Sequence, residues 1–140
     1  MALGSFSIDI SKFVKKVPDK VNEMVRKIVF DVYRNVVMRT PFDTGRAMGN
    51  WQIDIDRMPT DILEATGQAM QDAVAQQLIN KSHTIIAKIK NNSVIYIINN
   101  CEYIIPLEHG HSRLQAPQGM VKITIEEYQQ YVKKASRSLK

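Results

Sequence analysis

The residues best suited to chemistry in this sequence include two histidines, His109 and His111, that follow Glu108. Imidazole and carboxylate groups are zinc ligands, and residues two apart on an extended segment can face one ion. Zinc needs three or four converging ligands, however, and the intervening Gly110 is typical of a loop. We therefore interpret these side chains as contact residues. A small metal-dependent hydrolase that uses them together with nearby aspartates is the less favoured alternative.

Carboxylates and one cysteine suggest two further kinds of chemistry. Asp54 and Asp56 are two residues apart in an alternating segment, and Asp61 and Glu64 follow closely, as in a magnesium cluster. Two-metal sites draw carboxylates from separate elements, so we favour a solvated strand face or a subunit contact. Cys101 has no oxyanion-forming motif beside it, so we assign it no nucleophilic role. The sequence therefore predicts no catalytic residue, no metal and no cofactor.

A long helix is predicted in the first part of the chain. Apolar residues recur every three or four positions from Pro18 onward, and Pro41 disfavours the helical region for Thr40. The pattern predicts a helix that ends near Arg39. Its apolar positions are Val21, Val25, Ile28, Val32 and Val36.

The remaining segments predict, in chain order, a strand at 51–56, a loop at 58–66, a helix at 68–80, and strands at 84–89, 94–98 and 121–125. Residues 90–93 join two of these strands as a hairpin. Thr124 and Glu127 form a capping box that opens a last helix, which ends near Ser138 and buries Tyr128, Tyr131, Val132 and Ala135. The fold class is α+β, with the long N-terminal helix and the C-terminal helix packed on a roughly four-stranded antiparallel or mixed sheet.

Length and composition are those of one soluble globular domain. The chain has 140 residues, 44% hydrophobic and 24% charged, and its single cysteine excludes an internal disulfide. The longest apolar run, Ile95 to Ile98, is too short for a membrane span. The net charge is +5, but residues 1–40, 41–80 and 81–140 carry +4, −4 and +5. This alternation favours contacts between charged faces of identical subunits over nucleic-acid binding.

Two segments that we expect to be loops have distinctive sequences. The first reads Thr40-Pro41-Phe42-Asp43-Thr44-Gly45-Arg46, followed by Asn50-Trp51. The second runs from Leu107 to Val121. Together they resemble the TPVDTGR…W and EYG…QAP.GMV motifs of the tail-completion, or head–tail joining, proteins of long-tailed bacteriophages, and the resemblance spans roughly residues 20 to 135. His109 replaces the family's tyrosine, which favours an aromatic contact role.

The resemblance implies a structural virion protein rather than an enzyme. The single domain would comprise residues 1–140, with an N-terminal arm at 1–17 and a docking loop at 106–119. The subunits would form a six-fold ring that joins the tail tube or tail terminator to the head-side connector, with DNA passing through it and no membrane involved. The protein would be made in the host cytoplasm and reside in the neck of the virion.

The residues that we expect at subunit or partner interfaces come from both loops and from the acidic strand. They are Arg46, Trp51, Asp54, Asp56, Glu108, His109, His111, Arg113, Gln115, Ala116, Pro117 and Met120. For Arg46 the acidic partners that we consider are Asp54, Asp56, Glu108 or a carboxylate of an adjoining subunit. We expect the adjoining subunit, because a loop-borne arginine more often serves a contact than a core.

A basic nucleic-acid-binding module is the second alternative. The sequence pI is about 9.4, and Lys133, Lys134, Arg137 and Lys140 give the last eight residues a charge of +4. Against this reading, the sequence has no alternation of basic and aromatic residues and no recognisable binding motif. The negative end of the helix dipole also favours basic residues at a helix C-terminus, so we interpret these four residues first as a solvated helix end.

Overall fold

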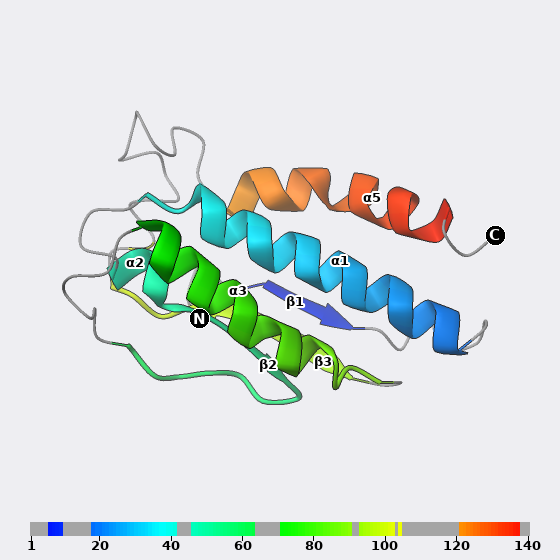
Figure 1. Cartoon of the computed structure of the whole chain (residues 1–140), viewed down its shortest axis with the longest axis horizontal. Helices are drawn as coiled ribbons and strands as arrows, with labels where there is room; N and C mark the ends of the chain where they lie inside the picture. Colours follow the sequence, from blue (N-terminus) through cyan, green and yellow to red (C-terminus); the bar gives the residue numbers. More distant parts are fainter. Residues whose placement is uncertain are drawn as a thin grey trace.

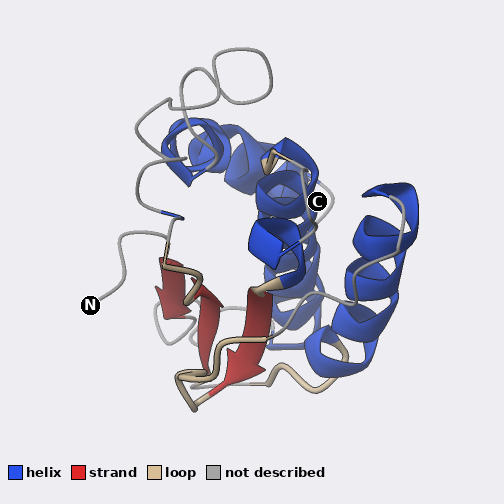
Figure 2. Cartoon of the chain, turned by 90° about the vertical axis from the view of Figure 1, so that its left-hand side faces the viewer, coloured by secondary structure: helices blue, strands red, loops and turns tan. Residues whose placement is uncertain are grey.

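The computed structural model describes residues 6–9, 18–41, 46–63, 71–90, 93–102, 104 and 121–137. These residues form an α+β fold in which the helices lie to one side of a three-stranded sheet (Figure 2). The elements are β1 (Phe6–Asp9), α1 (Pro18–Arg39), α2 (Arg46–Gly49), β2 (Trp51–Ile55), α3 (Gln71–Ile86), β3 (Val94–Asn99) and α5 (Val121–Arg137).

Helix α1 is the central element, and its predicted bounds are confirmed. It lies between α5 and α3 and also contacts β2 (Figure 1). Because three neighbours surround it, the buried surface is wider than a single stripe. Ile28 and Val32 are 2% and 1% exposed, and Tyr33, which the apolar pattern did not include, is 2% exposed. Burying this many large side chains makes α1 the main contributor to the core.

The sheet is antiparallel, with the strand order β1-β3-β2. Strand β2 was predicted, and it pairs with β3 from Trp51 opposite Asn99 to Ile55 opposite Ile95. Strand β1 lies within the segment that we expected to be an arm, and it pairs with β3 from Phe6 opposite Ile97. The α+β class is therefore right, but the described residues form three strands instead of four.

The predicted strand at 84–89 and its hairpin are wrong. Helix α3 was expected to end at residue 80 but continues through Thr84 to Ile86. Ala75, Ser82 and Ile86 are buried and lie seven and four residues apart, which is the period of one helical face. Packing of that face against the core overrides the strand preference of the β-branched residues at the end of the segment.

The predicted strand at 121–125 is also wrong, because these residues form the first turns of α5. Val121 and Thr124 are 6% and 1% exposed, and Ala135, further along the same face, is fully buried. Thr124 therefore lies inside the helix and is not an N-cap, so the capping box does not exist. The expected burial is confirmed for Ala135, while Tyr128, Tyr131 and Val132 are partly buried against the core.

Candidate functional site

The described residues of the first motif lie at a buried junction between α1, α2 and β2. The Thr40 hydroxyl donates a hydrogen bond to the carbonyl of Val36 at 2.6 Å and accepts one from Nε1 of Trp51 at 2.6 Å. The Tyr33 hydroxyl donates to the carbonyl of Trp51 at 2.9 Å, and burial raises the pKa of this hydroxyl well above its usual range. Each of these polar groups is thus satisfied inside the core, as buried polar groups must be.

Asn50 and Asn99 complete this junction, and both are fully buried. The amide nitrogen of Asn50 donates to the carbonyls of Arg46 and Leu63 at 2.7 and 2.8 Å, and its oxygen accepts from the Leu63 amide at 2.6 Å. Asn99 donates to the carbonyl of Ala47 at 2.7 Å. Asparagine suits this task because one side chain carries both a donor and an acceptor. The motif residues Thr40, Asn50 and Trp51 therefore act in folding.

The junction holds a stretch without regular secondary structure, residues 58–63, which we call the tethered segment. Besides the bonds from Asn50, Gln52 donates to the carbonyl of Asp61 at 2.8 Å, and Asn100 donates to the carbonyls of Pro59 and Asp61 at 3.0 and 3.1 Å. Three side-chain amides thus fix a backbone that has no secondary structure of its own.

The tethered segment exposes apolar side chains. Met58, Ile62 and Leu63 are 53%, 48% and 42% exposed. The described part of the chain has five exposed large hydrophobic residues, and three of them lie in these six positions. Such a concentration on a fixed backbone is typical of a contact surface, whereas single exposed apolar residues are common on any protein.

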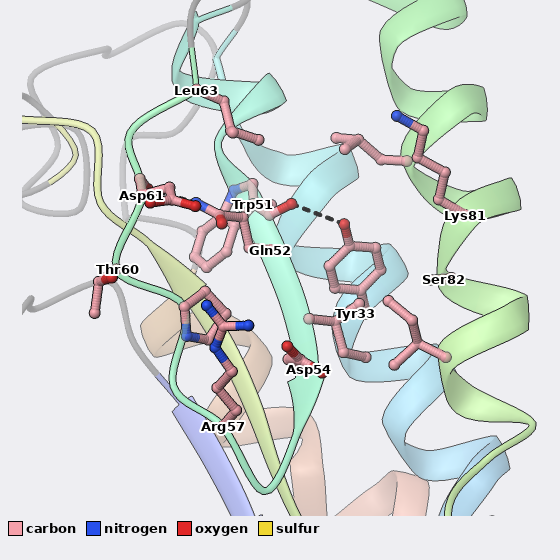
Figure 3. Close-up of a pocket in the computed structure, with 14 residues that line it drawn as sticks. Tyr33, Trp51, Gln52, Asp54, Arg57, Thr60, Asp61, Leu63, Lys81 and Ser82 are labelled. Carbon is pink, nitrogen blue, oxygen red and sulfur yellow. Dashed lines mark hydrogen bonds between the residues drawn. The ribbon is translucent and has the colours of Figure 1, made fainter.

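A hollow of about 280 Å³ separates the tethered segment from α3, with β2 at its base. Figure 3 shows Arg57, Thr60 and Asp61 on one side of β2 and Lys81 and Ser82 on the α3 side. The Ser82 hydroxyl donates to the carbonyl of Ile79 in its own helix, so it is not activated by a base. The hollow mixes apolar walls with charges of both signs, which fits a partner's side chain better than hydrolytic chemistry.

Arg46 has an acidic partner in its own chain, and the sequence analysis did not include it among the candidates. The guanidinium Nη1 lies 2.6 Å from Oε1 of Glu102, 56 residues away. The hydrogen bond from Arg46 and then its charge hold the pKa of the Glu102 carboxyl below its usual range. The glutamate side chain is 67% exposed, so this ion pair contributes little to stability.

The two aspartates of the expected acidic strand face are engaged with backbone amides. Asp56 lies beyond β2 with a φ of 60°, so it does not share the strand face of Asp54. Its carboxylate accepts the Val94 amide at 2.8 Å, and its own amide donates to the Val94 carbonyl at 2.7 Å. Asp54 accepts the Ile55 amide at 2.8 Å. Because Asp56 lies outside the alternation of β2, our interpretation of a strand face shared by the two aspartates is corrected.

Trp51 also needs correction as an interface residue. Its side chain is 1% exposed and belongs to the core, so it offers no surface to a partner in this fold. The other expected interface residues lie outside the described residues. They are Glu108, His109, His111, Arg113, Gln115, Ala116, Pro117 and Met120.

A second polar cluster fastens α5 to α1. Arg39 donates to Glu127 at 2.7 Å and to the hydroxyl of Thr124 at 3.0 Å. Tyr131 donates to the other oxygen of Glu127 and accepts from Asn35. The hydrogen bond from Tyr131, followed by that from Arg39, lowers the pKa of the Glu127 carboxyl, while burial and the bond to Glu127 raise the pKa of Tyr131.

Among the described residues, no group of three or more histidine, cysteine or acidic side chains could hold a metal ion. No helix in this part of the chain is long and apolar enough to cross a membrane. Comparison of the sequence with protein-family models and curated proteins, and of the fold with solved structures, finds no match.

Proposed function

We propose that this chain is a structural subunit of the neck of a long-tailed bacteriophage, where copies form a ring that joins the tail to the head-side connector. The proposal starts from the resemblance of the two loop motifs to tail-completion proteins. It is supported by the tethered segment, which is the single observation that carries it. A fixed segment with three exposed apolar side chains is better suited to assembly than to catalysis.

The rigidity of the tethered segment matters for assembly. Ordering a loop during association costs conformational entropy, and a segment that is already held by Asn50, Gln52 and Asn100 avoids most of that cost. In a ring, each contact is heterologous, so one face of a subunit must complement a different face of the next. We assign the tethered segment and the adjacent hollow to one such face.

The loop at 106–119 is proposed as the docking element for the neighbouring ring or tail. Its assignment rests on its length and on the specific run Gln115-Ala116-Pro117. Glu108, His109, His111, Arg113 and Met120 complete the proposed contact set. Arg46 remains in the set only as a residue at the edge of the buried junction, since its charge is already paired with Glu102.

Matched substitutions test whether the tethered segment makes the contact. Ile62→Ser should reduce the ring fraction in native mass spectrometry, whereas Ile125→Ser, at 45% exposure on α5, should leave it unchanged. Met58→Ser and Met38→Ser, at 53% and 46% exposure, form a second pair with the same expectation. If both variants of each pair reduce the ring fraction equally, the tethered segment does not form the subunit contact.

Assembly itself is tested by light scattering of the wild-type protein, alone and with isolated tails. A subunit that stays monomeric in both conditions would contradict the ring. Deleting residues 114–118 should leave the fold intact, by circular dichroism, but block the joining of heads to tails. Infectious particles that carry this deletion would refute the docking role of the loop.

A further inference from the structure

A groove with basic walls runs between α1 and α5, on a different surface from the tethered segment. Its volume is about 730 Å³. The lining residues are Asp31, Arg34 and Asn35 of α1 and Gln130, Tyr131, Lys133, Lys134 and Arg137 of α5. Four cations face one carboxylate in this groove, so it has a net charge of about +3.

The walls of the groove are fixed relative to each other. Asn35 donates to the hydroxyl of Tyr131, which in turn donates to Glu127. Arg39 pairs with the same glutamate at 2.7 Å, so that carboxylate is neutralised within the helix pair. Among the described residues that line the groove, Asp31 is the one acid beside the four cations.

The helix dipole explains the position of only some of the groove cations. Lys134 and Arg137 lie in the last turn of α5, where the helix dipole favours positive charge. Arg34 is on the opposite wall and lies before the last turn of α1, where the effect of a helix dipole has fallen off. Cations that converge from two helices across a groove point to an anionic ligand between them.

We infer that this groove binds the phosphate backbone of double-stranded DNA. The acidic strand of a second copy is a poorer occupant, because Asp56 lies beyond β2 with a φ of 60° and does not add its charge to the strand face of Asp54. Single-stranded nucleic acid is also a poorer fit, since it needs aromatic rings on which bases stack. Among the described residues that line the groove, the one aromatic ring is that of Tyr131, which is partly buried and whose hydroxyl both donates and accepts a hydrogen bond.

Fluorescence anisotropy with a short labelled duplex of random sequence tests the inference on the full-length protein. Affinity should fall linearly with salt on a logarithmic plot, because binding releases counterions. The double variant Lys134→Gln/Arg137→Gln should reduce the magnitude of that slope by about 1.8, or about 0.9 for each neutralised phosphate contact. Arg34→Gln, on the other wall, should reduce it by about 0.9 and leaves α5 intact.

The matched control is Lys88→Gln/Lys90→Gln, which removes two exposed cations outside the groove and changes the net charge by the same amount. This control should keep the wild-type slope. Equal loss in both double variants, or a wild-type slope near zero, would overturn the inference. Displacement of the duplex by polyglutamate at equal charge would assign the groove to an acidic protein instead. The isolated subunit suffices, so failure of the ring proposal would not affect this result.

Discussion

The indole nitrogen of Trp51 donates a hydrogen bond to the hydroxyl of Thr40 at 2.6 Å, and both residues are almost completely buried. This bond connects the end of α1 to the start of β2. It explains why Thr40 and Trp51 occur in one motif eleven residues apart. The motif thus secures a fold, while the surface available for contact lies next to it.

Thr40→Val should lower the free energy of unfolding by about 1–3 kcal/mol, because it leaves the buried Nε1 of Trp51 without an acceptor. The isosteric change keeps the volume, so packing loss is small. Thr40→Ser, which keeps the hydroxyl, should lose less. Urea melts of the three proteins measure this difference, and equal stability of Thr40→Val and wild type would show that the hydrogen bond is dispensable.

Asn50→Ala should release the tethered segment while most of the core stays in place. The substitution removes three hydrogen bonds, two of which hold the backbone of Leu63. Hydrogen exchange of the Leu63 amide should become much faster, because its acceptor is gone. Exchange in β3 provides the internal reference. Uniform acceleration across both segments would mean that the change acts on global stability instead.

The coupling between Arg46 and Glu102 in a double-mutant cycle should be weak, since the glutamate side chain is 67% exposed to solvent. The coupling should shrink as salt is added. Glu102→Gln also distinguishes a contact of Arg46 within its own chain from a contact with a neighbouring subunit. If Arg46 reaches a neighbouring subunit as well, Arg46→Ala should weaken assembly and Glu102→Gln should not. Equal effects of both changes on assembly would confine Arg46 to its own chain.

Glu127 should give the protein an acid-sensitive component of stability. Its pKa is lowered in the folded chain, so the stabilisation is complete above the unfolded pKa and is lost as pH falls through the folded value. The side chain is partly exposed, and the contribution is below about 1 kcal/mol. Glu127→Gln should flatten the decline of unfolding free energy below about pH 4.5, whereas Glu126→Gln, an exposed neighbour, should not. An unchanged pH profile would contradict this role.

Ile28→Ala should cost about 2–5 kcal/mol, since the side chain is 2% exposed at the centre of the helix face that contacts its neighbours. Met38→Ala, at 46% exposure on the same helix, is the control and should change stability by less than about 0.5 kcal/mol. A loss below about 0.5 kcal/mol for Ile28→Ala would place α1 at the periphery of the core.

The local sequence pattern was sufficient to predict an element where the pattern extended over many residues or alternated without interruption. Helix α1 and strand β2 appear at their predicted positions, because 22 residues of helical period and the alternation from Trp51 to Ile55 each favour one structure. The segment 121–125 was mistaken for a strand because three alternating apolar residues also fit a helix, and the segment 84–89 because β-branched residues, which favour strands, end α3. For such short runs, packing against the neighbouring element decides whether a helix or a strand forms.

The sequence by itself determined the α+β class, the buried face of α1 and the apolar character of the core, all of which follow from side-chain period. Only the tertiary structure decided which polar groups meet. Glu102 lies 56 residues from Arg46, Glu127 lies 88 from Arg39, and Asn50 binds a segment that has no periodic pattern. A hydrogen bond between distant residues leaves no trace in local spacing, because it forms only after packing has brought its partners together.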